Sequence, residues 1–373
     1  MSRNIEQIFA DFDVTYEGQF KKYLGEGKKV AGTLAAYCPN ELIHAAGIIP
    51  LTAWGFEIEL NKSKEYFPAF YSTVALSTLE KGLLGDFKGM EFMIINGLTD
   101  TLKATGQNWK RAIKEVPFIN LAVAQNRKIE AGIEFNTTQI IKTKEKIEAL
   151  TGCTITDEKV EEAIKLFNDN RRKLQEFVEL VPKHLDIVSA SRRTKVIASS
   201  NYMEKSEHNA LLDELIEALK ALPDYDYKGT KVVSTGIISE ITGVLKIFDD
   251  NDIAIVADNI LQESGYYNYL VEENSGNPLR ALAMILSTAE GTSILLDKDK
   301  KRADFVVEDV KKYGADGVIM VMLKFCDSEE FDYPIMKKRF DGEGLMSLVI
   351  EVDQQMESYE QANTLVQTFV EMI

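Results

Sequence analysis

Short apolar runs alternate with longer amphipathic segments in the amino-terminal part of the chain. The runs at 30–37, 92–97 and 118–123 consist mainly of apolar residues, as expected of strands that are buried on both faces. The segments 72–84 and 101–114 carry apolar residues at helical spacing. Strands that alternate with helices are typical of βαβ units, so this part of the chain is predicted to form a parallel sheet.

The central part of the chain is predicted to be helical. Apolar residues recur at helical spacing in 128–150 and in 204–222, and Thr156 has the character of a helix N-cap. A polar segment at 224–229 then indicates a linker.

The alternation of strands and helices resumes after the linker. Strands are predicted at 231–238, 253–257, 318–325 and 347–352, and helices at 240–248, 278–289, 302–313 and 359–373. The pattern predicts an α/β protein with two Rossmann-like or flavodoxin-like parallel-sheet domains and a helical insert between them. The predicted boundaries are 1–126 for the first α/β domain, 127–223 for the helical region and 224–373 for the second α/β domain.

Charge and composition argue against nucleic acid and membranes as partners of this chain. The chain has 43 basic and 59 acidic side chains, a formal net charge of −16, so it will repel phosphate backbones and we expect no nucleic-acid partner. No apolar run approaches the length of roughly 18 residues that a membrane span needs, so we expect no membrane association. The first residues lack a secretory pattern and three scattered cysteines form no disulfide framework, so we expect a cytoplasmic protein.

Cys326 stands directly after a predicted buried strand. The apolar run 317–323 leads into the polar segment 324–334, and open parallel sheets bind their ligands outside the carboxyl ends of such strands. A lone cysteine is more often a packing residue than a ligand. Position alone therefore favours packing but leaves a cofactor role open.

For several other polar side chains, a structural role in packing or at the surface competes with a functional role. His44 is a candidate general base, but its apolar surroundings favour a packing residue. His184 and His208 are expected at the surface. The acidic residues Glu329, Glu330 and Asp332 are expected to form a solvated loop.

Several short motifs occur in the same order along this chain as in a known protein family. They are Tyr37-Cys38-Pro39-Asn40-Glu41, Tyr66-Phe67-Pro68-Ala69-Phe70, Asp100-Thr101-Leu102, Gly106-Gln107-Asn108-Trp109-Lys110, Gln125-Asn126-Arg127, the Lys324-Phe325-Cys326-Asp327 segment and Glu351-Val352-Asp353-Gln354-Gln355. Together they make the chain resemble the smaller β-type subunits of 2-hydroxyacyl-CoA dehydratases, a family that also includes benzoyl-CoA reductase subunits.

The resemblance implies a 4Fe–4S cluster with three cysteine ligands. The matching positions here are Tyr71, Thr99 and Cys326, so only the third is a cysteine. Iron–sulfur clusters prefer thiolates, and a phenol and a hydroxyl are poor substitutes. The chain's own cluster is therefore doubtful, while a rearranged cluster that uses Cys38, or one that uses Tyr71 as a ligand, stays open.

The resemblance also changes how three other positions are interpreted. Glu41, near Cys38 at a strand-to-helix junction, is either a residue favoured by the helix N-terminus or part of a cofactor pocket. Asp100 is either a helix cap, with surface amides after it and Trp109 packed at an interface, or part of a pocket or interface. Cys38 and Asp100 thus join Cys326 as candidates for the cofactor region.

The activity that the resemblance implies is elimination of water from (R)-2-hydroxyacyl-CoA to give 2-enoyl-CoA, through a ketyl radical. It further implies a heterodimer with an α-type dehydratase subunit, and an ATP-dependent iron–sulfur activator protein that supplies the electron. The alternative is a catalytically silent paralogue that acts as a structural or regulatory partner. The acyl chain of the substrate is not disclosed by the sequence.

Overall fold

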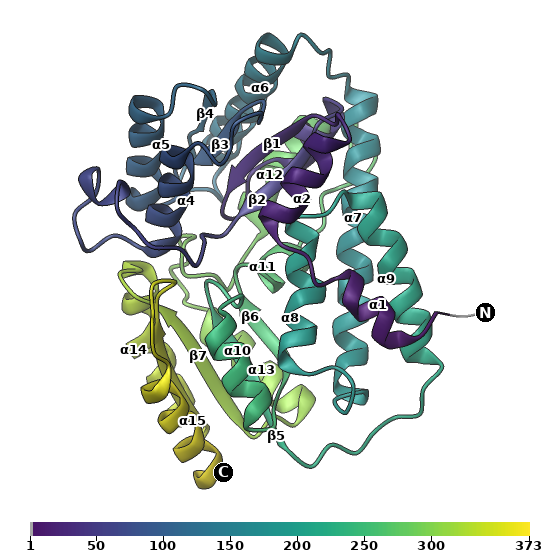
Figure 1. The fold of residues 1–373 in the computed structure, drawn as a ribbon, viewed down its shortest axis with the longest axis vertical. Coiled ribbons are helices and arrows are strands. Elements are labelled where there is room, and N and C mark those ends of the chain that lie inside the picture. Colours follow the sequence, from purple (N-terminus) through teal and green to yellow (C-terminus); the bar gives the residue numbers. More distant parts are fainter. Residues whose placement is uncertain (1–2) are drawn as a thin grey trace.

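Two four-stranded parallel sheets form the framework of the protein. The computed structural model describes residues 3–373, and Figure 1 shows the first sheet in the upper half of the view and the second below it. The strands of the first sheet are β1 (Val30–Leu34), β2 (Ile49–Ala53), β3 (Met93–Asn96) and β4 (Phe118–Leu121). Those of the second are β5 (Thr230–Gly236), β6 (Ile253–Ile260), β7 (Gly317–Leu323) and β8 (Met346–Val352). The predicted α/β fold with two parallel sheets is confirmed.

Both sheets have the same strand order. The first runs β2-β1-β3-β4 and the second runs β6-β5-β7-β8, with every neighbouring pair parallel. In each sheet the second strand along the chain pairs with one side of the first strand, and the third strand pairs with its other side. The point where strand order reverses is where open α/β sheets bind ligands. The two such points lie between β1 and β3 and between β5 and β7.

Helices cover the sheets and fill the space beside them. They are α1 (Ile5–Asp11), α2 (Tyr16–Gly25), α3 (Asn40–Ala45), α4 (Thr73–Leu84), α5 (Asp100–Ala112), α6 (Glu130–Thr151), α7 (Asp157–Leu180), α8 (Ala190–Ala198), α9 (Lys205–Lys220), α10 (Thr242–Asp250), α11 (Ser264–Tyr267), α12 (Pro278–Thr288), α13 (Arg302–Tyr313), α14 (Asp327–Gly342) and α15 (Glu360–Met372). The predicted helical insert corresponds to α6 to α9, and Thr156 caps α7 as expected, since its hydroxyl accepts a hydrogen bond from the backbone N–H of Lys159.

Two helices link the halves of the molecule. Helix α7 contacts α3 of the first half and both α11 and α12 of the second, and Figure 1 shows it along one side of the molecule. Helix α12 packs against α6, and its residues Ala281, Leu282 and Ala283 share a core with Ala31 and Ile94 of the first sheet. The later part of the chain thus supplies core to the first sheet, and the boundaries at 126 and 223 stay predictions.

The segment after β7 is a helix and not the solvated acidic loop that the sequence suggested. Helix α14 begins at Asp327, so Glu329 and Asp332 lie on its buried face while Glu330 remains exposed. Glu329 is buried because its carboxylate pairs with the guanidinium of Arg302 on α13. The cost of burying the Glu329 carboxylate is offset because it forms an ion pair and hydrogen bonds with Arg302.

The expectation that His184 and His208 lie at the surface is also wrong. Both are buried. The ring of His208 lies 2.8 Å from the side-chain amide of Asn170 and 3.1 Å from the carbonyl oxygen of Val196. Burial lowers the pKa of His208 to about 3, so the ring is neutral and acts as a packing and hydrogen-bonding group.

Among residues 3–373, no helix combines the length and the apolar character that crossing a membrane requires.

Candidate functional site

A cavity of about 250 Å³ lies where the carboxyl edges of the two sheets face each other. We call it the inter-sheet cavity. Residues that follow β1, β3, β5 and β7 all line it, so it touches the point of strand-order reversal in both sheets. Its apolar wall consists of Val74, Ala75, Leu102, Ile237, Leu261 and Leu323, and Cys326 and Thr99 also line it. Such a cavity, apolar with a few polar groups, is the usual form of a ligand site.

The backbone is strained where β1 and β7 enter this cavity. Ala35 has a φ of 61° and Phe325 a φ of 59°, in the left-handed region that residues with a Cβ rarely adopt. Both residues line the inter-sheet cavity. Strain of this kind costs about 1–3 kcal/mol per residue and gathers at functional sites. Its occurrence after one strand of each sheet, at residues that line the same cavity, supports a functional role for the cavity.

Cys326 is the N-cap residue of helix α14, and its side chain is half-buried. Its backbone N–H donates to the carbonyl oxygen of Leu323 at 3.2 Å, and its Sγ lies 3.5 Å from the hydroxyl oxygen of Ser328. Burial and the nearby Glu329 carboxylate raise the pKa of the thiol to about 11. The predicted position of Cys326, beyond the end of a buried parallel strand, is therefore confirmed.

Thr99 lines the same cavity as Cys326, whereas Tyr71 does not. The Thr99 hydroxyl is the N-cap of α5, where it accepts from the backbone N–H of Leu102 at 3.2 Å. The ring of Tyr71 packs instead on Phe67, with 4.9 Å between ring centroids, although the adjacent Ser72 does line the cavity.

Asp100 is the first residue of α5 and not its cap, which corrects one of its two interpretations. Its side chain is 96% exposed at the cavity rim and pairs with Lys103 at 3.2 Å. Trp109, expected at an interface, is fully buried in the core, where its indole N–H donates to the carbonyl oxygen of Val116. Its large apolar ring is removed from water in the core of the first half, where it stacks on Phe87.

Cys38 and Glu41 line a separate, smaller cavity of about 60 Å³, which we call the Cys38 cavity. The Cys38 thiol accepts from the Asn96 amide at 3.6 Å, and burial raises its pKa to about 12. Glu41 is buried and pairs with Arg171 of α7 at 2.6 Å. Cys38 thus does not line the inter-sheet cavity with Cys326, although Ala35 lines both cavities.

His44 lines neither of these two cavities. Its ring packs edge-on against Phe167 with 5.8 Å between centroids, and burial lowers its pKa. The geometry agrees with the packing interpretation and gives no support to a general base.

Buried arginines are the polar residues that the sequence did not reveal. Arg302 donates from Nε to the Asn259 side chain at 2.9 Å and pairs with Glu329, directly behind Cys326. Arg193 of α8 pairs with Asp258 and Glu263 at the end of β6. No local pattern could have found them, because each partner carboxylate lies far away in sequence.

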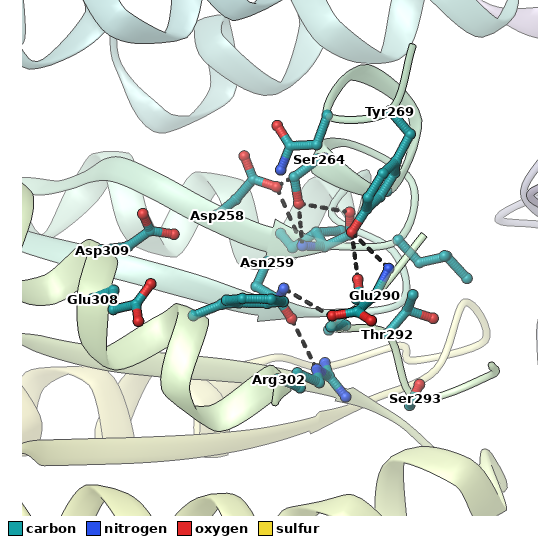
Figure 2. A pocket seen from close by; sticks show the side chains of 17 residues that line it. Asp258, Asn259, Ser264, Tyr269, Glu290, Thr292, Ser293, Arg302, Glu308 and Asp309 are labelled. Atoms are coloured by element: carbon teal, nitrogen blue, oxygen red, sulfur yellow. Dashed lines mark hydrogen bonds between the residues drawn. The ribbon is translucent and has the colours of Figure 1, made fainter. Parts of the chain in front are cut away.

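A third cavity, of about 300 Å³, lies outside the carboxyl end of edge strand β6 (Figure 2). We call it the β6 cavity. Asn259 is held between the carbonyl oxygen of Gly291 and the guanidinium of Arg302, as the dashed lines show. Asp309 lies across the cavity from these groups, and burial raises its pKa to about 6. The cavity is polar and most of its charged groups already have partners.

Comparison with known proteins identifies the family. Residues 35–373 match the model of the family described as 2-hydroxyglutaryl-CoA dehydratase, D-component. The chain belongs to this family. It is 40% identical to the β subunit of the (R)-phenyllactyl-CoA dehydratase of Clostridium sporogenes, over 99% of this chain and 100% of the relative.

Two further relatives of this dehydratase-family chain are β subunits as well. It is 36% identical to the β subunit of the lactoyl-CoA dehydratase of Anaerotignum propionicum, over 93% of this chain and 92% of the relative. It is 37% identical to the β subunit of the (R)-2-hydroxyglutaryl-CoA dehydratase of Acidaminococcus fermentans, over 94% of each chain. The resemblance found in the motifs is confirmed.

The side chains of the inter-sheet cavity do not fit a 4Fe–4S cluster held by this chain alone. Cys326 is the only cysteine that lines the cavity, and Thr99 already uses its hydroxyl to cap α5. Among residues 3–373, no three His, Cys, Asp or Glu side chains are placed to hold a metal ion. A cluster requires several thiolates, and the inter-sheet cavity of this dehydratase-family chain offers one.

Proposed function

We propose that this chain is the β-type subunit of a heteromeric 2-hydroxyacyl-CoA dehydratase and so one part of a lyase. The observation that carries the proposal is the near full-length match to three β subunits whose names specify three different acyl groups. A chain aligned from end to end with such subunits is expected to keep their partner surface. The strained, apolar inter-sheet cavity supports the retention of a ligand-facing site.

The reaction proposed for the complex is removal of water from (R)-2-hydroxyacyl-CoA to give 2-enoyl-CoA. The hydrogen that must leave is not acidic enough for an ordinary base, so we propose the ketyl-radical route, started by one electron from an ATP-dependent iron–sulfur activator. The α-type subunit receives that electron. No residue of this chain is assigned a proton transfer, since His44 lies outside the cavities and Glu41 is neutralised by Arg171.

This chain's share of the work is proposed to be the wall of the active site and the dimer surface, without a cluster of its own. The ligand count supports this, because Thr99 and Tyr71 stand at two of the three expected cysteine positions. The inter-sheet cavity then holds an apolar group or closes against the partner. Its lining of aliphatic side chains suits either use.

The experiment is reconstitution with the α-type subunit and its activator under anaerobic conditions. We expect dehydration of a 2-hydroxyacyl-CoA only when this chain is present, while the chain purified alone contains no iron or acid-labile sulfide. Ser328→Trp, which fills the inter-sheet cavity, should lower activity about tenfold or more. Ser358→Trp, at an exposed site, is the matched control and should leave it unchanged.

A catalytically silent paralogue is the second candidate. The missing thiolates favour it, because loss of cofactor ligands is the expected result of relaxed selection on a site. It predicts that dehydration by the α-type subunit and activator is the same with and without this chain. That result would contradict the first proposal, and iron in the isolated chain would contradict the ligand assignment.

A further inference from the structure

A cavity of about 250 Å³ between the two halves has a chemistry unlike that of the inter-sheet cavity. We call it the Glu240 cavity. The loop after β2, with Phe56 and Glu57, and the start of α2, with Tyr16, form the side from the first half. Glu240 and Gln354 belong to the second half. The cavity thus bridges two parts of the chain that meet only in the tertiary structure.

Two buried polar atoms in this cavity have no partner. Tyr16 is 4% exposed and Gln354 is 7% exposed, and both line the cavity. Neither the Tyr16 hydroxyl nor Oε1 of Gln354 makes a hydrogen bond within residues 3–373. The Gln354 amide is oriented by its Nε2, which donates to the carbonyl oxygen of Trp54 at 2.9 Å. Leaving such atoms unsatisfied costs about 1–3 kcal/mol each, which a ligand with N–H donors would recover.

Two of the carboxylates that line this cavity, Glu240 and Glu57, have no basic partner within residues 3–373. The Glu240 carboxylate accepts from the Tyr202 hydroxyl and from the Gln262 amide, the latter at 3.2 Å. Glu57, at the rim, accepts from the backbone N–H of Thr242 at 3.0 Å. Within residues 3–373, neither Glu240 nor Glu57 has an ion pair with a lysine or arginine, although the lining residue Glu17 pairs with Lys81. A positive ligand would therefore be attracted.

Aromatic side chains line this cavity and pack against one another. The ring of Tyr16 meets Phe56 edge-on at 5.4 Å and Tyr202 edge-on at 5.9 Å between centroids. Aromatic faces and carboxylates together are the usual surroundings of organic cations. A metal ion is a poorer fit, because no three acidic, His or Cys side chains of residues 3–373 are close enough to coordinate one.

We propose that the Glu240 cavity binds a small organic cation with a primary ammonium group. The ammonium donates to the Glu240 carboxylate, to Oε1 of Gln354 and to the Tyr16 hydroxyl, and its alkyl part lies against Phe56. The site is independent of the proposed dehydratase activity. Because residues of both halves line the Glu240 cavity, the bound ligand would also stabilise the contact between the two halves.

The proposal implies a definite dependence on pH. Burial, together with the carboxylates of Glu57 and Glu263, raises the pKa of Glu240 to about 7, although the hydrogen bonds from Tyr202 and Gln262 oppose the shift. The ammonium needs the ionised carboxylate, so affinity should rise as pH increases through the pKa. Binding should also release a proton from the fraction of Glu240 that is still protonated.

The test is calorimetric titration of the full chain with butylammonium chloride, with potassium chloride as the ionic control. We expect saturable binding at millimolar concentration that is tighter at about pH 8 than at about pH 6, with no comparable binding of potassium. Equal binding of both salts, or no saturable heat from butylammonium, would overturn the proposal.

Variants separate the site from non-specific attraction to an acidic protein. Glu240→Gln should weaken butylammonium binding about tenfold or more and abolish its pH dependence. Tyr16→Phe removes only a hydroxyl that has no partner, so it should fold normally and still bind more weakly. Glu308→Gln, an exposed residue of the β6 cavity, is the matched control. Unchanged binding in Tyr16→Phe and Glu240→Gln would place the cation elsewhere and refute the assignment.

Discussion

The two sheets share one strand order but satisfy the polar groups at their strand ends in different ways. In the first sheet these groups are neutral: the Thr33 hydroxyl lies 2.9 Å from that of Thr52, which also accepts from Asn40 at 3.0 Å. In the second sheet they are charged: Asp258 and Glu263, at the end of β6, both pair with a buried arginine. The same topology therefore does not impose the same electrostatics.

The difference extends to the inter-sheet cavity. Its first-half side presents Thr99, a hydroxyl that serves as a helix cap, whereas its second-half side presents Cys326 in front of the Arg302–Glu329 pair. At the positions where the resemblance implies thiols, the first half has Tyr71 and Thr99, and the second half has Cys326. The comparison teaches that two sheets of one topology can satisfy their polar strand ends either with buried ion pairs or with neutral hydrogen bonds. Removing one partner of a buried ion pair should cost more stability than removing one partner of a neutral hydrogen bond.

The largest effect should come from returning thiols to the first half. Tyr71→Cys combined with Thr99→Cys should raise iron content from none to about four atoms per chain after anaerobic reconstitution, because the chain then has a thiol at each of the three expected ligand positions. Iron, acid-labile sulfide and the visible spectrum measure this. Adding Cys326→Ser to the double variant should remove the iron again. A folded double variant without iron would mean that the cavity itself has changed, or that Tyr71 is not the matching position.

The next effect should come from breaking the buried charge of the second half. Arg193→Met leaves Asp258 and Glu263 buried without their counter-ion, so the free energy of unfolding should fall by about 3–5 kcal/mol. Urea unfolding of the variant measures it. Lys228→Met, which breaks an exposed pair with Asp226, is the control and should change stability by less than about 1 kcal/mol. Equal losses in the two variants would refute the contrast.

The smallest effect should come from the neutral network of the first half. Thr52→Val keeps the shape of the side chain but removes the acceptor of the Asn40 amide, so the free energy of unfolding should fall by about 1–2 kcal/mol. The same urea experiment applies. A loss as large as that of Arg193→Met would show that the two sheets depend equally on their polar strand ends.

Much of the fold could be predicted from the chain because its local signals agree with one another. The helix predicted at 302–313 has those bounds in the structure, and the strands predicted at 318–325 and 347–352 correspond to β7 and β8. Helix α14 was missed because its internal Pro334 and its weak periodicity hide the helical pattern, although the acidic residues of its first turn favour a helix start. The burial of Glu329 on this helix could not be foreseen either, because its partner Arg302 is adjacent only in space.

The candidate site was predicted in part. The position of Cys326 beyond a strand follows from periodicity, and the family follows from short motifs that keep their order. That Thr99 shares its cavity, whereas Cys38 belongs to another cavity and Tyr71 packs on Phe67, could not be deduced from spacing. Side-chain direction at a strand end depends on the turn that follows, and here Ala35 and Phe325 adopt strained turns.

The sequence by itself determined the class of fold, the family and the shortage of thiol ligands, because these depend on local periodicity and on which residue occupies each position. Only the tertiary structure decided which polar groups meet. It paired Arg193 with Asp258, buried His208, and brought Tyr16 and Gln354 to the Glu240 cavity. The physical reason is that burial and charge compensation are properties of a place in the folded protein, and residues far apart in the chain create that place together.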